Sequence, residues 1–304
     1  MHAQKNQRKA YIFGFAAVCL WSTVATAFKL SLRHLGPEAL VFYAGLTSIL
    51  VLALILAMQG KLKELSRLTW KEARFSLLLG GLNPFLYYLI LIRAYDLLRA
   101  QEAQAINYTW AITMSILAIP LLGQRLRGFQ FLAMGLGYLG ALVISTHGNL
   151  LGFEMDSPLG FGLAMGSTVI WALFWILGVK DALDPVLRLL LNFCCGTFYT
   201  AAWAILSGIS LAPNAPGFLG AVYIGVFEMG VTFVLWMTAL RLSRTTAQVS
   251  NLIYLAPFLS LFIIHFLVGE TIYASTLVGL AFILAGTVVQ KFADAQGTPS
   301  EANK

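Results

Sequence analysis

The chain has 304 residues, of which 59% are hydrophobic and only 11% are charged. Soluble domains carry about 25% charged residues, so this chain has too few charges to cover a water-facing surface of its size. Its net charge of +7 has the sign that favours nucleic acid, but the basic residues sort by membrane side instead of forming a patch. The composition excludes a sizeable soluble domain and argues against a nucleic-acid partner.

Ten apolar runs follow one another along the chain. A bilayer core about 30 Å thick requires about 20 apolar residues per helix, whereas a membrane β-barrel would show shorter segments of alternating polarity. We therefore predict an all-α membrane protein with ten transmembrane helices. They are expected at residues 11–32, 39–58, 75–93, 103–122, 129–146, 159–179, 187–207, 217–238, 246–267 and 274–290.

The basic residues determine the predicted orientation of these spans. Sixteen of the 20 fall in the two termini and in alternate loops, and only Lys29, Arg33, Arg93 and Arg99 fall on the other side. Lys and Arg mark cytoplasmic loops. We therefore expect a multi-pass protein of the bacterial inner membrane, with the lipid bilayer as its environment and both termini in the cytoplasm.

The two halves of the chain match each other, which indicates an internal duplication. The clearest pair is Ala103–Asn107 (AQAIN) with Ala247–Asn251 (AQVSN). Four further pairs follow in the same order at a nearly constant offset: Trp21 with Trp171, Pro37 with Pro185, Ala94 with Ala239, and Gly123 with Gly269. Each half has five helices, an odd number, so the second copy should enter the membrane from the opposite side.

The duplication predicts the domain organisation. We expect a cytoplasmic tail at 1–10, a first five-helix repeat at 11–146, a non-cytoplasmic linker at 147–158, a second repeat at 159–290 and a disordered cytoplasmic tail at 291–304. The basic start and the apolar run after it imitate a cleavable signal peptide. Cleavage would leave nine spans and destroy the repeat, so we expect the first span to stay.

Inverted repeats are typical of transporters, because they supply two similar gates around one midplane site. A duplicated receptor or scaffold is the alternative, but the chain offers no soluble domain through which to signal. Self-contained repeats make a monomer the expected state.

Several motifs resemble those of a known family. They are Leu20-Trp21-Ser22 with Lys29, the Ala-Gln-x-x-Asn starts of the fourth and ninth spans, Pro120 and Pro257 within those spans, and Gly269-Glu270 before the last span. The chain resembles the drug/metabolite transporter superfamily with its paired EamA-type repeats. Gly123-Gln124-Arg125 departs from the usual Gly-Glu pair in the first repeat. The resemblance implies export of amino acids, with aromatic ones as one option.

Glu228 is the only acidic residue in the middle of an apolar run. An ionisable residue at membrane depth is costly and is therefore a functional candidate. The offset that pairs Ala94 with Ala239 places Asn83 opposite Glu228, so we expect both beside a central cavity. Glu228 would bind a substrate amine, carry a coupling proton, or both; the alternative is a neutral carboxyl group hydrogen-bonded to a neighbouring helix.

Aromatic and amide side chains recur at helical spacing inside the spans. Aromatic walls with a few polar anchors suit an amino acid or a similar small metabolite, and the alternative is a belt of interfacial aromatics. The predicted cavity residues are Asn83, Tyr87, Asn107, Trp110, Trp171, Trp175, Glu228, Asn251 and Tyr254. Pro84, Pro120 and Pro257 interrupt apolar runs and are candidate gating hinges or ordinary kinks.

The sequence gives little support for a metal-binding or a dinucleotide-binding site. The three cysteines lie in apolar runs and the four histidines form no His-x-x-x-His pair, so no metal site is predicted. The glycines at 135, 137 and 140 match a dinucleotide pattern but lie inside a span, and we interpret them, like Gly162 and Gly166, as positions of close helix packing.

No phosphate loop or catalytic constellation appears, so we expect neither an enzyme nor a cofactor. The leading hypothesis is a secondary transporter that exports amino acids or related small metabolites by alternating access. A passive channel and an exporter of cationic drugs or other metabolites stay open as alternatives.

Overall fold

The computed structural model describes residues 5–123, 128–150, 155–178, 181–243, 249 and 251–297. Within these residues every regular element is helical. Six helical segments are long and apolar enough to cross a membrane. They are α1 (Gln7–Leu32), α2 (Pro37–Met58), Trp70–Leu97, α8 (Pro158–Gly178), α9 (Pro185–Leu206) and Ala215–Leu242.

Two of the six are interrupted in the middle, the first by a kink and the second by a π-helical turn. The first comprises α3 (Trp70–Gly80), the kinked segment η2 (Gly81–Leu86) and α4 (Tyr87–Leu97). The second comprises α10 (Ala215–Tyr223), the π-helical η3 (Ile224–Val231) and α11 (Thr232–Leu242). Such turns are frequent at functional sites, because they release backbone groups and re-aim side chains.

The remaining helices are shorter, except for α14 (Ala274–Gly297), of which only the part Ala274–Val289 is apolar. They are the 3-10 helix η1 (Leu62–Arg67), α5 (Ala100–Asn107), α6 (Trp110–Leu122), α7 (Gly128–Ser145), the 3-10 helix η4 (Asn251–Leu255), α13 (Ala256–Val268) and α14. Apolar stretches at Phe131–Ser145, Leu252–Val268 and Ala274–Val289 fall just short of the length of a full span. The described residues therefore agree with the predicted class, an all-helical membrane protein.

Several boundaries differ from the expected ones. The run at 103–122 is broken between α5 and α6, where the Thr109 hydroxyl donates to the Ile106 carbonyl at 2.8 Å and so competes with the helical ladder. Asn6 caps α1, which therefore begins before residue 10. Helix α14 continues through part of the expected 291–304 tail as far as Gly297.

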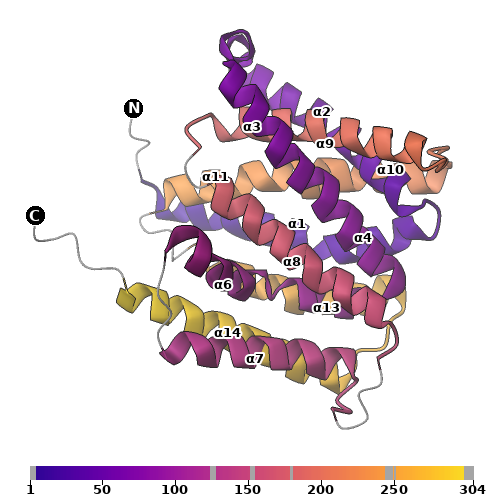
Figure 1. Cartoon of the computed structure of the whole chain (residues 1–304), viewed down its shortest axis with the longest axis vertical. Coiled ribbons are helices and arrows are strands. Elements are labelled where there is room, and N and C mark those ends of the chain that lie inside the picture. The colour runs from indigo at the N-terminus through magenta and orange to yellow at the C-terminus, as the bar shows by residue number, and fades with distance from the viewer. Residues whose placement is uncertain are drawn as a thin grey trace, which may run out of the picture.

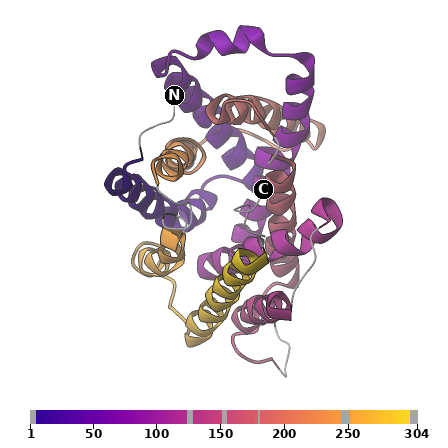
Figure 2. The ribbon, with the colours of Figure 1, turned by 90° about the vertical axis from the view of Figure 1, so that its left-hand side faces the viewer.

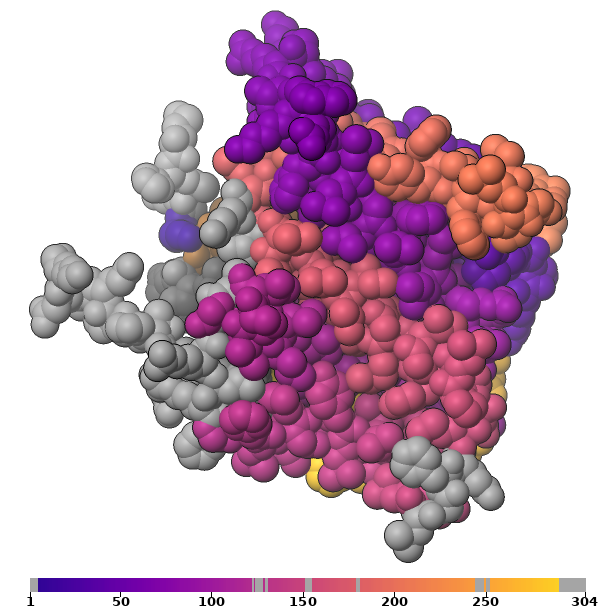
Figure 3. All heavy atoms as spheres, viewed as in Figure 1, coloured from indigo at the N-terminus to yellow at the C-terminus, as the bar shows by residue number. Residues whose placement is uncertain are grey.

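Helices from opposite halves of the chain pack on one another (Figures 1 and 2), and α3, α4 and α8 run obliquely to α7, α9 and α14 (Figure 1). Helix α2 contacts α9, α4 contacts α8, α1 contacts α11 and α13, and α7 contacts α14. The start of α1 and the end of α14 lie at the same end of the bundle (Figure 1). In the face shown in Figure 3, side chains of α3, α4 and α8 form a closely packed surface.

Glycines set the spacing between α7 and α14. A Cβ atom added at Gly140 would lie 2.4 Å from the Gly279 carbonyl oxygen, and one at Gly279 would lie 2.5 Å from the Gly140 carbonyl. Close packing is therefore the role of Gly140. It is not the role of Gly135, Gly162 or Gly166, which have open space around them. Our interpretation of these three was wrong, because no described residue lies within 4 Å of a Cβ atom added at any of them.

Asp184 fixes the start of α9. Its Oδ1 accepts from the amides of Val186 at 3.0 Å and Leu187 at 3.3 Å, and its Oδ2 lies 2.5 Å from Lys61 Nζ. Burial alone would raise the pKa of Asp184, but the Lys61 ammonium and these amides lower it below its ordinary value of 3.8. Asp184 therefore stabilises the fold fully at a pH above its pKa in the unfolded protein. This stabilisation is lost as the pH falls through its pKa in the folded protein.

Replacing Asp184 by Ala should lower stability by about 1 kcal/mol at neutral pH, the usual cost of losing an N-cap. Thermal unfolding in detergent at pH 7 measures it, and the difference from wild type should shrink in acid. Asp96→Asn is the matched control, because among the described residues Asp96 forms an ion pair only with Arg93, at exposed i,i+3 positions. Equal shifts for the two variants would contradict the capping role.

Candidate functional site

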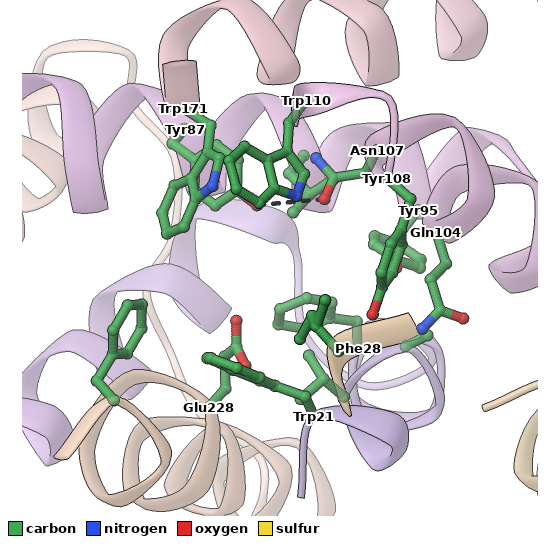
Figure 4. A pocket seen from close by; sticks show the side chains of 15 residues that line it. Trp21, Phe28, Tyr87, Tyr95, Gln104, Asn107, Tyr108, Trp110, Trp171 and Glu228 are labelled. Carbon is green, nitrogen blue, oxygen red and sulfur yellow. Dashed lines mark hydrogen bonds between the residues drawn. The ribbon is translucent and has the colours of Figure 1, made fainter. Parts of the chain in front are cut away.

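A cavity of about 130 Å³ lies in the middle of the bundle. Helices α1, α4, α5, α6, α8 and α11, together with η3 and η4, contribute its lining (Figure 4). A pocket of about 150 Å³ is large enough for a benzene molecule, so the cavity suits a group of that size. The side chains that line it are Trp21, Val24, Ala25, Phe28, Tyr87, Leu91, Tyr95, Gln104, Asn107, Tyr108, Trp110, Trp171, Glu228, Phe233 and Ile253.

Glu228 is the acidic group of the cavity. It lies in the π-helical η3 between α10 and α11, and its carboxyl group points into the open space (Figure 4). Oε1 accepts a hydrogen bond from the Tyr88 hydroxyl at 3.1 Å. Oε2 is buried and makes no hydrogen bond to any described residue, and the Trp21 indole lies beside the carboxyl group (Figure 4).

No described Lys or Arg lies within ion-pair distance of Glu228. A buried carboxylate oxygen without a partner is costly. The site therefore offers an acceptor that a ligand with a positively charged or hydrogen-bond-donating group would satisfy.

Aromatic rings form most of the remaining lining. Trp171 of α8 stacks on Tyr87 of α4, with ring centroids 4.5 Å apart and an angle of 29° between the planes. Across the cavity, the rings of Trp21 and Phe233 meet edge to face at 6.0 Å. Figure 4 shows Trp171 and Trp110 on one side, with Glu228 and Trp21 on the other. A flat apolar group placed between them would contact aromatic rings on both sides.

Asn107 is the second polar anchor. Its amide nitrogen donates to the Ser167 hydroxyl at 3.0 Å, and its amide oxygen accepts from the Tyr87 hydroxyl at 3.4 Å (dashed in Figure 4). These two bonds connect α5 to α4 and α8. Because Asn107 is the last residue of α5, the break before α6 helps to place its side chain at the cavity.

The structure brings together five of the nine candidate residues: Tyr87, Asn107, Trp110, Trp171 and Glu228. Asn83 does not line the cavity; it is fully buried in η2, and its amide atoms make no hydrogen bond to described residues. Trp175 packs edge-on against Trp171 but is 41% exposed on the outer face of α8. Tyr254 also lies outside the lining, and the side chain of Asn251 lies outside what the structure describes.

Other lining residues were missed by our reading of the sequence. Trp21, Ala25 and Phe28 lie on one face of α1, and Tyr87, Leu91 and Tyr95 lie on one face of α4. Both sets recur at i, i+4 and i+7 or i+8, the spacing of a helix face. Extending the face of Tyr87 by two turns would have found Tyr95.

Lys29 and Glu270 belong to the motifs that resemble the family. Both lie outside the cavity and form hydrogen bonds with backbone groups at helix ends. Lys29 Nζ donates to the carbonyls of Tyr95 at 2.6 Å and Leu98 at 2.5 Å, where α4 ends. Glu270 accepts from the amide of Ala100 at 2.7 Å, where α5 begins. A cation at a helix C-terminus and an anion at an N-terminus are both favoured by the helix dipole. The two charges thus stabilise the α4–α5 corner.

The three candidate hinge prolines occupy different positions. Pro84 lies within η2, next to Asn83, whose backbone is extended (φ −141°, ψ 117°). Pro120 lies inside α6, two residues from its end. Pro257 lies in the first turn of α13, where a proline removes no intrahelical hydrogen bond. Of the three, only Pro84 accompanies a break in the middle of a long span.

A search of known families and proteins gave consistent matches. The sequence profile of the EamA-like transporter family matches residues 8–146 and again residues 158–290. An aromatic amino acid exporter, YddG of Ancylobacter novellus, is 27% identical over 260 residues, which cover 84% of this chain and 87% of that protein. The two matches confirm the family resemblance seen in the motifs.

Further relatives are named only as uncharacterized transporters. One from Clostridium kluyveri is 21% identical, with 93% of each chain covered. YvbV of Bacillus subtilis is 24% identical, with 91% of this chain and 89% of that protein covered. A crystal structure at 23% identity matches 96% of this chain and 100% of its own with a TM-score of 0.67, which shows a shared fold.

Proposed function

Because the chain belongs to the EamA-like transporter family, we propose that it is a secondary active transporter that exports amino acids, aromatic ones among them, across the bacterial inner membrane. The observation that carries the proposal is the Glu228 carboxyl group in a cavity walled by aromatic rings, with no described Lys or Arg beside it and with Oε2 free of hydrogen bonds to described residues. An amino acid offers the ammonium group that this carboxylate lacks, and an aromatic side chain fits between Trp171 and Trp21.

We propose the ten-helix inverted repeat as the architecture of the transporter. The segments Trp70–Leu97 and Ala215–Leu242 have 28 residues each, and the regular helix of each is interrupted in its middle, by a kink at η2 and by a π-helical turn at η3. Helices α6 and α13 have 13 residues each and end in left-handed glycines, Gly123 and Gly269. The double family match supports repeats at 11–146 and 159–290. With five spans in each half, the copies have opposite orientations and both termini lie in the cytoplasm.

The mechanism we propose is alternating access, in which the two halves rock around the central cavity. The kink at η2 and the π-helical turn η3 interrupt the regular helix of their spans, and the break at Asn83–Pro84 is the strongest hinge candidate among the three prolines. Asn83 would then act in the hinge, since it lies outside the cavity lining. Glu228 would bind the substrate amine in one step and a proton in another, so that export is driven by the proton gradient.

Reconstitution into sealed liposomes tests this function. Labelled aromatic amino acids should accumulate against their concentration gradient when a proton gradient is imposed. Sugars and cationic drugs should not. Equilibration without accumulation would identify a passive channel, because a channel cannot concentrate its solute. Accumulation of the drugs in place of amino acids would overturn the substrate assignment.

Replacing Trp171 by Ala should raise the KM for an aromatic amino acid about threefold to tenfold, because a ring pair contributes about 0.5–1.5 kcal/mol beyond its buried area. Uptake kinetics in liposomes measure it, and Trp171→Phe should restore most of the affinity. Trp203→Ala is the matched control, because Trp203 is 48% exposed on α9 and lies outside the cavity. A KM unchanged in Trp171→Ala would remove Trp171 from the binding site.

A further inference from the structure

Three potential metal ligands from separate segments meet at one end of the bundle. Glu102 is in the first turn of α5, His147 follows the end of α7, and Asp156 precedes the start of α8. Each offers one ligand atom, and the three atoms lie within 4.8 Å of one another. The cluster lies outside the cavity, and nothing in the proposed transport mechanism uses it.

Glu102 is the buried member of the cluster. It is 2% exposed, and its Oε1 makes no hydrogen bond to any described residue. The nearest polar atom on His147, Nδ1, is 3.7 Å from that oxygen, which is too far for a hydrogen bond. Two ligands about 2.0–2.1 Å from a tetrahedral zinc ion are separated by roughly 3.3 Å. The gap between Oε1 and Nδ1 is thus close to the separation of two ligands in one shell.

Asp156 lies beside the second ring nitrogen of His147, Nε2. Its Oδ2 lies 3.1 Å from His147 Nε2, and a metal-binding histidine is usually oriented in this way by a carboxylate on its second nitrogen. His147 has a left-handed backbone (φ 50°), an unusual conformation for a residue other than glycine, and its ring packs edge-on against Tyr273 at 5.2 Å. The ring is therefore held with Nδ1 facing Glu102.

We propose that Glu102, His147 and Asp156 form a binding site for a divalent cation of the zinc class. Glu102 Oε1 and His147 Nδ1 are the inner ligands. Asp156, which is 57% exposed, orients the ring or swings in as a third ligand. An imidazole among carboxylates favours zinc over magnesium and calcium, which prefer oxygen ligands alone. The exposed Asp156 leaves an entry path from solution.

The site would connect the linker between the two halves to the cavity. His147 and Asp156 lie at the two ends of that linker, and Glu102 lies on α5, whose residues Gln104 and Asn107 line the cavity. A bound ion would hold α5 against the linker and restrain its movement. We therefore expect zinc to slow transport and to raise the melting temperature of the protein.

Calorimetric titration of the full chain in detergent tests the site, with any polyhistidine tag removed. Wild-type protein should bind one Zn²⁺ saturably, and millimolar Ca²⁺ should not displace it. Glu102→Gln and His147→Asn should each weaken binding at least tenfold, as loss of ligands or of their supports does. Asn is chosen at position 147 because it tolerates the left-handed backbone.

Two variants at the same end of the bundle serve as controls. His34→Gln and Asp96→Asn remove an exposed imidazole and an exposed carboxylate outside the cluster, so both should bind Zn²⁺ as the wild type does. Equal melting temperatures in EDTA establish that all variants are folded. Absence of one-site binding, or affinity unchanged in both Glu102→Gln and His147→Asn, would overturn the proposal and leave an imidazole bridging two carboxylates. The titration needs no transport, so its failure is distinct from failure of the proposed function.

Discussion

Replacing Glu228 by Gln is expected to abolish proton-driven accumulation of substrate while the protein still folds. Gln has nearly the same volume and retains an oxygen that can accept from the Tyr88 hydroxyl, which lies 3.1 Å from Oε1 in the wild type. It cannot carry a negative charge or exchange a proton. Removing one partner of a buried charge pair costs about 2–5 kcal/mol, which corresponds to a loss of about 30-fold or more in affinity for an ammonium group.

Two measurements separate the roles of Glu228. Binding of substrate to purified protein reports the loss of the ammonium partner, and uptake into liposomes across a range of pH reports the loss of coupling. The variant should show a flat pH profile where the wild type shows a dependence. Unchanged accumulation at every pH would eliminate the coupling role, and unchanged affinity would eliminate the amine-binding role.

Two variants serve as controls for Glu228→Gln, one that contacts Glu228 and one that lies outside the cavity. Tyr88→Phe removes the hydrogen bond to Oε1 but keeps the carboxylate, so it should reduce transport without removing its pH dependence. Glu64→Gln changes a carboxylate in η1, outside the cavity, and should leave transport unchanged. A loss in Glu64→Gln equal to that in Glu228→Gln would indicate a general effect of charge instead of a specific site.

Replacing Gly140 by Ala is expected to destabilise the protein strongly through the α7–α14 contact. The added methyl group would lie 2.4 Å from the Gly279 carbonyl oxygen and 2.9 Å from the Ile283 side chain. The Gly279 carbonyl belongs to helix backbone and the Ile283 side chain is buried in the core. Because neither can move aside easily, α7 and α14 must separate. Overpacking of this kind costs about 1–3 kcal/mol, and α7 is the main helix that packs along α14. Thermal unfolding in detergent and the yield of monodisperse protein measure the effect.

Gly135→Ala is the matched control on the same helix. Gly135 has open space where its Cβ would lie, and alanine is about 1 kcal/mol better than glycine within a helix. The control should therefore be neutral or stabilising, opposite in sign to Gly140→Ala. Gly279→Ala should repeat the loss from the other helix, since its added carbon would lie 2.5 Å from the Gly140 carbonyl. Similar melting temperatures for the Gly140 and Gly135 variants would contradict the close contact.

The sequence by itself determined the class of this protein and the location of its most unusual charge. Long apolar runs have no stable place in water, so they identify membrane helices wherever they occur. Glu228 stood out because a carboxyl group inside such a run is rare. The motifs around Trp21 and Asn107 determined the family, because they are local strings that need no folding to be read.

Tertiary structure decided which side chains face the cavity. The offset between the two halves of the sequence predicts that Asn83 pairs with Glu228, yet only Glu228 points into the open space, because the backbone at Asn83 leaves the helical path. Trp21 and Tyr95 line the cavity, while Trp175 faces outward. Hydropathy cannot separate these cases. The lipid-facing and the packed sides of a membrane helix are both apolar, so its pattern does not report how the helix is rotated.

The same limit explains why the cluster at residues 102, 147 and 156 was invisible in the sequence. Its members belong to three segments that the fold brings to one end of the bundle, and no spacing rule connects them. A His-x-x-x-His pair is recognisable because one helix turn sets its geometry. Here the geometry is set by the packing of α5 against the corner between α7 and α8, which only the folded chain contains.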